Sequence, residues 1–245
     1  CHEHAGHGPV PGIKTDDNKW ETAGHRQRII EVDEELLGLF ARLYDEPDTP
    51  ALQARLPALH ARDLTKALER LSEAPHRLQD EEGRYTPTCM WDESRAQKPI
   101  GSQAEPTIRR ATQFPATPDD LILSGPHFFV GNPAYKTPRS VCTVNSHYDV
   151  LDLPDLPDDY LPRTNYVSAC DLATYRDRTP TVPWGSAVEP ARVTNYYRVV
   201  VVNMIGPASE RTHQPAIAPR GVGHINTVNS YTLNDTLQMT QLFAT

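Results

Sequence analysis

The chain has 245 residues, a formal net charge of −8 at pH 7, 38% hydrophobic residues and a mean hydropathy of −0.56. This length is sufficient to bury a core in one large or two small domains. The longest aliphatic run is the four valines at 199–202. A run of four is far below the ~20 apolar residues that cross a bilayer, so the composition excludes a membrane-spanning helix and predicts a cytoplasmic protein.

Charge is distributed unevenly along the chain. Residues 1–106 hold 13 Lys/Arg against 20 Asp/Glu, whereas residues 107–245 hold 11 against 12. Autonomous nucleic-acid binders are usually basic, because neutralising phosphates supplies much of their affinity. A domain tethered to a partner that also contacts DNA is less constrained. The charge pattern therefore disfavours a free-standing DNA binder but allows a tethered one.

The N-terminal residues 1–28 show no periodicity and predict an extended arm. The chain begins with Cys rather than Met, so we expect it to be part of a longer protein. Its first residues are of types that zinc prefers, but no spaced ligand set accompanies them, and we predict no metal site. The cysteines form no CxxC pair and are interpreted as reduced thiols. These residues are Cys1, His2, His4 and His7 at the terminus, and Cys89, Cys142 and Cys170 further along.

Residues 29–84 are predicted to form a helical connector. Asp33–Tyr44 places apolar residues at helical spacing behind an acidic first turn, where the helix dipole favours negative charge. Thr49–Leu56 predicts a short helix with Thr49 as its cap. Pro57–Ala74 repeats the amphipathic pattern and predicts a third helix.

From residue 85 to residue 245 prolines are frequent, and short Val-, Ile-, Tyr- and Phe-rich segments alternate with turn residues. Asp152–Tyr160 predicts an acidic loop with one helical turn. Tyr196–Val202 fits either a strand or the end of a helix begun at Val188. The strand candidates are Leu121–Leu123, Phe128–Val130, Tyr148–Leu151, Arg198–Asn203 and Ile225–Val228. The expected fold class is α+β, with a helical N-terminal region followed by a mixed, loop-rich β-sheet domain.

The tetrapeptide Asn132-Pro133-Ala134-Tyr135 resembles the catalytic loop of amino-directed DNA methyltransferases. In that family, acceptors of the loop hold the exocyclic amine and the aromatic ring stacks on a flipped base. The resemblance makes Asn132 and Tyr135 candidate catalytic residues, although the third position is Ala where the family has Pro. No glycine-rich loop for S-adenosylmethionine accompanies it, since the nearest glycines, in 221–223, lack the expected surroundings. The tetrapeptide is therefore either a turn or a divergent catalytic loop that another subunit completes.

A wider resemblance covers about residues 90–230. Five segments occur in one order: Trp91–Arg110, Leu121–Cys142, Leu161–Cys170, Arg178–Trp184 and Glu210–Asn226. Together they resemble the C-terminal specificity region of large bacterial adenine-N6 DNA methyltransferases that fuse methylase and target-recognition domain in restriction-modification and phage-defence systems. This chain departs from that family at His213-Gln214-Pro215, where a longer apolar strand is usual.

The resemblance implies a division of labour within a parent enzyme. This part would choose the sequence of double-stranded DNA, and the methylase domain of the same polypeptide would flip an adenine and transfer a methyl group to N6. S-adenosylmethionine would then be bound by the parent enzyme and not by this part. Subunits of a defence system are further expected partners.

Arginine, lysine, asparagine and tyrosine in loop-like settings are the candidate DNA contacts. Arg can bind guanine O6 and N7, and Asn can bind adenine N6 and N7. The candidates are Arg109, Arg110, Lys136, Arg139, Arg163, Asn165, Tyr166, Arg176, Arg178 and Arg211. An alternative reading is a protein-docking module of a defence complex, which the acidic helical N-terminal part would suit.

Overall fold

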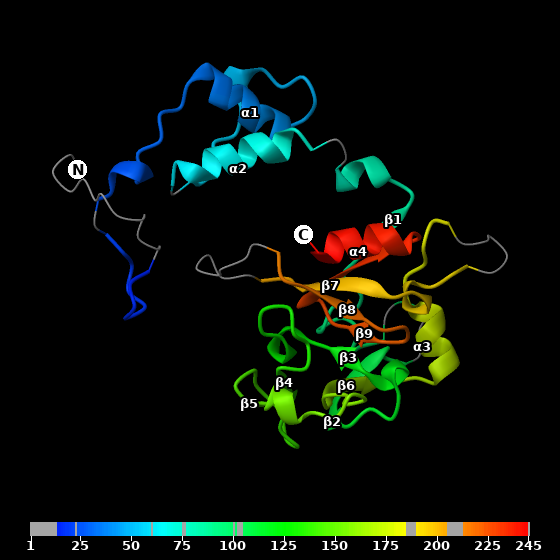
Figure 1. Cartoon of the computed structure of the whole chain (residues 1–245). Helices are drawn as coiled ribbons and strands as arrows, with labels where there is room; N and C mark the ends of the chain where they lie inside the picture. The colour runs from blue at the N-terminus through cyan, green and yellow to red at the C-terminus, as the bar shows by residue number, and fades with distance from the viewer. Residues whose placement is uncertain are drawn as a thin grey trace. The chain divides into compact units, whose positions relative to one another are not determined.

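The computed structural model describes residues 14–22, 24–59, 61–74, 77–99, 101, 105–184, 190–204 and 213–244. The chain divides into two compact units, Cys1–Asp80 and Glu81–Thr245. The described elements of the first unit are helical, and those of the second are mainly strands (Figure 1). The fold class is α+β, as predicted from the sequence.

Helix α1 (Glu34–Tyr44) dominates the N-terminal unit and confirms the predicted helix. The side chain of Asp33 caps it by accepting the N–H of Leu36, and Phe40 is among its buried residues. Helix α2 (Asp63–Ser72) is shorter than predicted, because the preceding backbone turns away so that the Arg62 N–H donates to the Gln27 carbonyl.

The short helix predicted at Thr49–Leu56 is only a 3-10 turn, Ala51–Gln53. The N–H of Arg55 donates to the Asp45 carboxylate at 3.0 Å instead of a helical carbonyl. Pro57 disfavours helical dihedrals at the residue before it. The helix that begins at Ala51 therefore ends after one turn.

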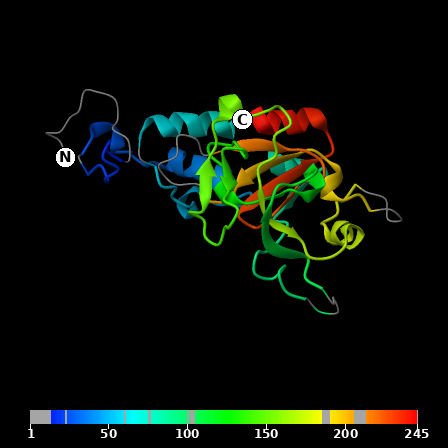
Figure 2. The same cartoon turned by 90° about the horizontal axis from the view of Figure 1, so that it is seen from below.

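A four-stranded antiparallel sheet forms the centre of the C-terminal unit. The valines at 199, 200 and 201 of β7 are buried, and they suit a central strand because β-branched side chains pack well on a pleated surface. Met239 of helix α4 (Thr236–Ala244) packs with Val199 and Leu233 on one face of this sheet, and Figure 2 shows α4 along that side. The strands in spatial order are β1 (Tyr85–Thr88), β10 (Val228–Leu233), β7 (Arg198–Val202) and β8 (Pro215–Ala218).

Three strand pairs surround this sheet. The first pair is antiparallel β2 (Ile108–Gln113) and β6 (Thr164–Ser168), the second is parallel β3 (Ile122–Leu123) and β9 (Gly223–His224), and the third is the hairpin of β4 (Lys136–Pro138) and β5 (Tyr148–Val150). Helix α3 (Leu172–Arg178) follows β6 and is capped by Asp171. Two apolar clusters join these elements, one around Trp91 and Tyr175 and one around Leu121 and Val200.

Strands β3, β5 and β7 confirm three of the strand predictions, and β7 decides against a helix at Tyr196–Val202. The strand predicted at Phe128–Val130 is wrong, since these residues enter a tight turn in which Val130 has φ +44°. The strand predicted at Ile225–Val228 is also wrong, because this segment mainly connects β9 to β10.

The acidic loop at Asp152–Tyr160 contains one 3-10 turn, Leu153–Asp155, as predicted. The described part of the alternative helix from Val188 holds only a 3-10 turn at Val193–Asn195, and Val188 itself lies outside the described residues. Within the described ranges, no helix has the length and apolar character needed to cross a membrane.

Candidate nucleic-acid interface

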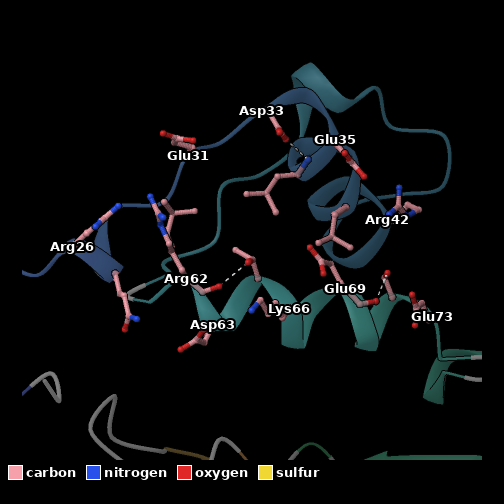
Figure 3. A pocket seen from close by; sticks show the side chains of 16 residues that line it. Arg26, Glu31, Asp33, Glu35, Arg42, Arg62, Asp63, Lys66, Glu69 and Glu73 are labelled. Atoms are coloured by element: carbon pink, nitrogen blue, oxygen red, sulfur yellow. Dashed lines mark hydrogen bonds between the residues drawn. The ribbon is translucent and has the colours of Figure 1, made fainter. Parts of the chain in front are cut away.

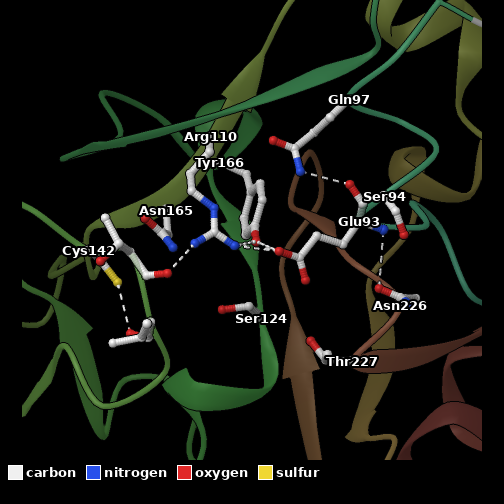
Figure 4. A network of polar contacts seen from close by, with 12 residues as sticks. Glu93, Ser94, Gln97, Arg110, Ser124, Cys142, Asn165, Tyr166, Asn226 and Thr227 are labelled. Carbon is white, nitrogen blue, oxygen red and sulfur yellow. Dashed lines mark hydrogen bonds and ion pairs between the residues drawn. The ribbon is translucent and has the colours of Figure 1, made fainter.

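A polar network on β2 and β6 contains two of the predicted DNA contacts, Arg110 and Tyr166 (Figure 4). The Arg110 guanidinium donates to the Glu93 carboxylate, to Tyr166 Oη at 2.8 Å and to the Thr143 carbonyl at 2.9 Å. Tyr166 Oη also donates to Glu93. Burial, followed by these bonds to Glu93, raises the pKa of Tyr166 well above its usual range. The network links β2, β6 and the loop of the β4–β5 hairpin.

Other predicted contacts also bind within the protein. Asn165 is buried, and its Oδ1 accepts a bond from Thr112 Oγ1 at 2.8 Å. Arg178 donates to the Glu105 carbonyl and to Thr107 Oγ1, and Arg176 forms an ion pair with Asp119 at 3.1 Å. Burial removes Asn165 and Tyr166 from any direct contact with a base, so these two residues support the strand. Arg211 lies outside the described residues.

Phe114 and Arg163 form an exposed aromatic-cation pair where β2 ends and β6 begins. The antiparallel register that pairs Gln113 with Thr164 brings the next residues, Phe114 and Arg163, together. The guanidinium carbon lies 4.5 Å from the ring centroid, and the Phe114 side chain is 56% exposed. The exposed ring and the cation together make this end of the sheet both apolar and positively charged.

A second aromatic-cation group lies at the start of β4. The rings of Phe129 and Tyr135 lie 4.7 Å apart, and Lys136 Nζ lies 5.7 Å from the centroid of Tyr135. β4 joins this group to the first, because the Arg163 N–H donates to Thr137 Oγ1 at 3.0 Å. We define the aromatic-cation surface as Phe114, Phe129, Tyr135, Lys136 and Arg163.

Neither cation of this surface has a carboxylate partner in the described part of the chain, in contrast to Arg139, which pairs with Asp149 at 2.8 Å. Arg109 is exposed farther along β2, opposite Val167. Lys136 and Arg163 are thus the predicted residues that the structure leaves best placed for an anion.

A buried histidine holds the backbone of Arg163 in place. The Arg163 carbonyl can only accept, so His127 Nε2 donates to it at 2.9 Å and Nδ1 accepts from Ser124. Ser124 Oγ in turn lies 3.0 Å from Tyr148 Oη. Burial lowers the pKa of His127, which keeps the ring neutral, and raises the pKa of Tyr148 to about 12.

The candidate catalytic loop is arranged as a turn. Asn132 Oδ1 accepts the N–H of Ala134 at 2.8 Å, so this oxygen already forms one hydrogen bond within the turn. The Tyr135 ring is stacked on Phe129. The glycines near residue 222 also have packing roles, because a Cβ on Gly221 would lie 2.9 Å from Asp119 and one on Gly223 would collide with Tyr175 Oη. The absence of a Cβ at these two positions therefore serves packing within the protein.

The N-terminal unit contains a cavity of about 1080 Å³ along α1 and α2 (Figure 3). Its charged lining residues include both signs, for example Glu35 and Glu69 as well as Arg62 and Lys66. The hydrogen bonds drawn there belong to helix ends, such as Leu36 N–H to Asp33. This lining shows no convergent set of groups that would recognise one ligand.

No cluster of three or more His, Cys, Asp or Glu side chains suited to a metal occurs within the described ranges. The candidate zinc ligands at Cys1, His2, His4 and His7 lie outside them. Comparison with known protein families, curated proteins and solved structures finds no match to this chain.

The sequence interpretation missed Phe114 and Phe129 as site residues. The apolar run Phe128–Val130 predicts a strand that contains Phe129, and the sequence around Phe114 predicts no role for it. The signal that could have identified Phe114 is an isolated aromatic residue directly before Pro115, where a strand has to end.

Proposed function

We propose that this chain is the DNA target-recognition part of an adenine-N6 DNA methyltransferase of restriction-modification or phage-defence type, and that it binds double-stranded DNA through the aromatic-cation surface. The observation that carries the proposal is the pair of exposed aromatic rings, Phe114 and Phe129, beside two cations without carboxylate partners, Arg163 and Lys136. Cations that lie next to rings can bind phosphate or guanine while the rings contact the sugars and bases.

The scaffold suits this task because the backbone of each cation lies at a strand end. Arg163 directly precedes β6. Its N–H donates to Thr137 Oγ1, and its guanidinium donates to the Pro138 carbonyl. Lys136 is the first residue of β4. The bond from the Arg163 guanidinium to the Pro138 carbonyl restricts the rotamers of Arg163, which lowers the entropic cost of binding DNA. As part of a bacterial DNA methyltransferase, the protein would act in the cytoplasm.

In this proposal the methyl transfer belongs to the methylase domain of the parent polypeptide. The hydrogen bond of Asn132 within its own turn and the packed glycines at 221 and 223 support this assignment. We expect isothermal calorimetry of the 245-residue chain with S-adenosylmethionine to give no heat of binding at micromolar concentrations. A micromolar dissociation constant would favour the alternative in which Asn132 and Tyr135 form a divergent catalytic loop.

Asp149→Asn should strengthen DNA binding by roughly threefold, since a carboxylate beside an exposed arginine is worth about 0.2–1 kcal/mol. Asp149 pairs with Arg139 on the hairpin next to the surface, and the side chains are both 54% exposed. The affinity would be measured by fluorescence anisotropy with a random 30-base-pair duplex pool at low and high salt. Asp177→Asn is the matched control, because it removes the same charge beside Arg192. Equal effects of both substitutions would show that only net charge matters.

A protein-docking module of a defence complex is the second candidate. The observation that favours it is that α2 is amphipathic in sequence but buries none of its residues, and Leu52, Leu56 and Leu71 are more than half exposed. A folded chain that ignores DNA at low salt but co-purifies with one defence subunit would support this candidate over DNA recognition.

A further inference from the structure

The turn between Phe129 and Asn132 carries a strained residue. Phe129 and Asn132 exchange two backbone hydrogen bonds of 3.2 and 2.9 Å, and the two residues between them, Val130 and Gly131, have φ +44° and +77°. Two positive φ values between paired residues are those of a type I′ turn, which strongly prefers Asn, Asp or Gly. Valine in this position is a genuine outlier, because its branched Cβ crowds the left-handed backbone.

Packing does not compensate for this strain. Val130 is 49% exposed and Phe129 is 57% exposed. Gly131, by contrast, is required, since a Cβ there would lie 2.6 Å from the Pro215 carbonyl oxygen. A strained residue that remains exposed and apolar points to a role outside the fold.

The base of the turn is rigid. The Tyr135 ring supports Phe129 at a centroid distance of 4.7 Å, and the bond from Ala134 N–H to Asn132 Oδ1 fixes the chain that leaves the turn. The turn therefore presents two apolar side chains on a fixed support, next to the cation of Lys136.

We propose that Phe129 and Val130 form a wedge that inserts between base pairs of the bound duplex. The inference rests on the proposed DNA-binding function and adds how the DNA is deformed. The positive charges of Lys136 and Arg163 favour DNA as the partner of this wedge, because they can bind the phosphates on either side of the opened base step. Wedges of this kind unstack a base step and kink the duplex, most easily at flexible pyrimidine–purine steps.

The test uses Val130→Asn in the full 245-residue chain. The probe is the duplex most enriched from a random pool by the wild-type chain, with 2-aminopurine placed at each position in turn. Wild-type protein should raise 2-aminopurine fluorescence severalfold at one step, since unstacking relieves quenching. Val130→Asn should abolish that rise and weaken binding about tenfold, the loss of one apolar contact of ~1.4 kcal/mol. It should also raise the melting temperature by a few degrees, because Asn relaxes the turn.

Two further variants separate strain from polarity. Val130→Thr keeps the branched shape and the strain, so it should lose the fluorescence response with no rise in melting temperature. Val141→Asn makes the matched change at a valine that is 72% exposed in the β4–β5 loop, and it should leave the fluorescence response unchanged.

The outcomes separate the two proposals. DNA binding with no fluorescence rise at any position would overturn the wedge and leave DNA recognition standing. A rise that survives Val130→Asn would also overturn it. A folded wild-type chain that enriches no duplex would overturn both proposals.

Discussion

Lowering the pH from 7 to 4 should destabilise the C-terminal unit by on the order of 3 kcal/mol through His224 alone, at 1.36 kcal/mol for each pH unit below the ordinary pKa. His224 is 1% exposed at the end of β9, where its Nε2 lies 2.9 Å from Ser230 Oγ. Burial, and after it the positive charge of Arg198, lowers the pKa of His224 to about 3.

The sign of this effect follows from proton binding in the two states. The unfolded chain protonates this histidine below pH ~6.5, whereas the folded chain keeps it neutral down to a pKa of about 3. The stability is therefore complete above pH 6.5 and is lost as the pH falls toward 3. His127 adds an effect of the same sign, because burial lowers its pKa as well.

Urea unfolding at pH values from 7 to 4 measures this dependence. The variant His224→Asn cannot be protonated, so its stability should fall less steeply with acidification than that of the wild type, even where its stability at pH 7 is lower. His147→Gln in the β4–β5 loop is the matched control and should keep the wild-type slope. Equal slopes for His224→Asn and the wild type would contradict the prediction.

Replacing Phe114 with Ala and Arg163 with Gln should each weaken binding to duplex DNA about tenfold, since one stacked or charge-paired contact contributes ~1–3 kcal/mol. The two groups lie 4.5 Å apart at the end of the β2–β6 pair. Arg163→Gln should also lower the slope of log affinity against log salt by about one, because one phosphate contact is lost. The double variant should lose less than the sum of the two, as expected for residues in contact.

Arg176→Gln is the matched control for the loss of positive charge. Arg176 belongs to α3, on the other side of the C-terminal unit from β4 (Figure 1), and it is paired with Asp119. Its substitution should change DNA affinity by less than about twofold, as expected for an exposed ion pair. A tenfold loss for Arg176→Gln, with none for Arg163→Gln, would move the interface to α3.

Much of the regular structure was predictable where the signal is local. Asp33 before leucines at helical spacing identified α1, whereas the consecutive valines of β7 fitted a strand or the end of a helix, and the structure has the strand. The short strands were harder, because β3 and β9 hold two residues each and exist only through pairing of segments about 100 residues apart. Helix α3 was missed although its cap, Asp171, bonds to the Thr174 N–H in the usual way.

The candidate site was predictable only in part, for a related reason. Arg110, Asn165 and Arg163 occur in similar local sequences, yet Arg110 is engaged by Glu93, Asn165 is buried against Thr112, and Arg163 stacks on an exposed ring. These partners lie far away along the chain, so the residues that neighbour Arg110, Asn165 and Arg163 in sequence do not indicate them. The sequence did not predict the turn at Phe129 and Val130, because Phe128-Phe129-Val130 has the high β-propensity of a strand. The strain at Val130 is visible only in its backbone dihedral angle φ.

The proposed function requires this chain to select a DNA sequence through the aromatic-cation surface. The most direct measurement incubates the 245-residue chain with a pool of random duplexes at low salt and sequences the bound fraction. We predict an enriched short motif that contains adenine and is lost in the double variant of Phe114→Ala and Arg163→Gln, but is retained in Arg176→Gln. A folded wild-type chain that enriches no motif, or a motif that survives the double variant, would contradict the account.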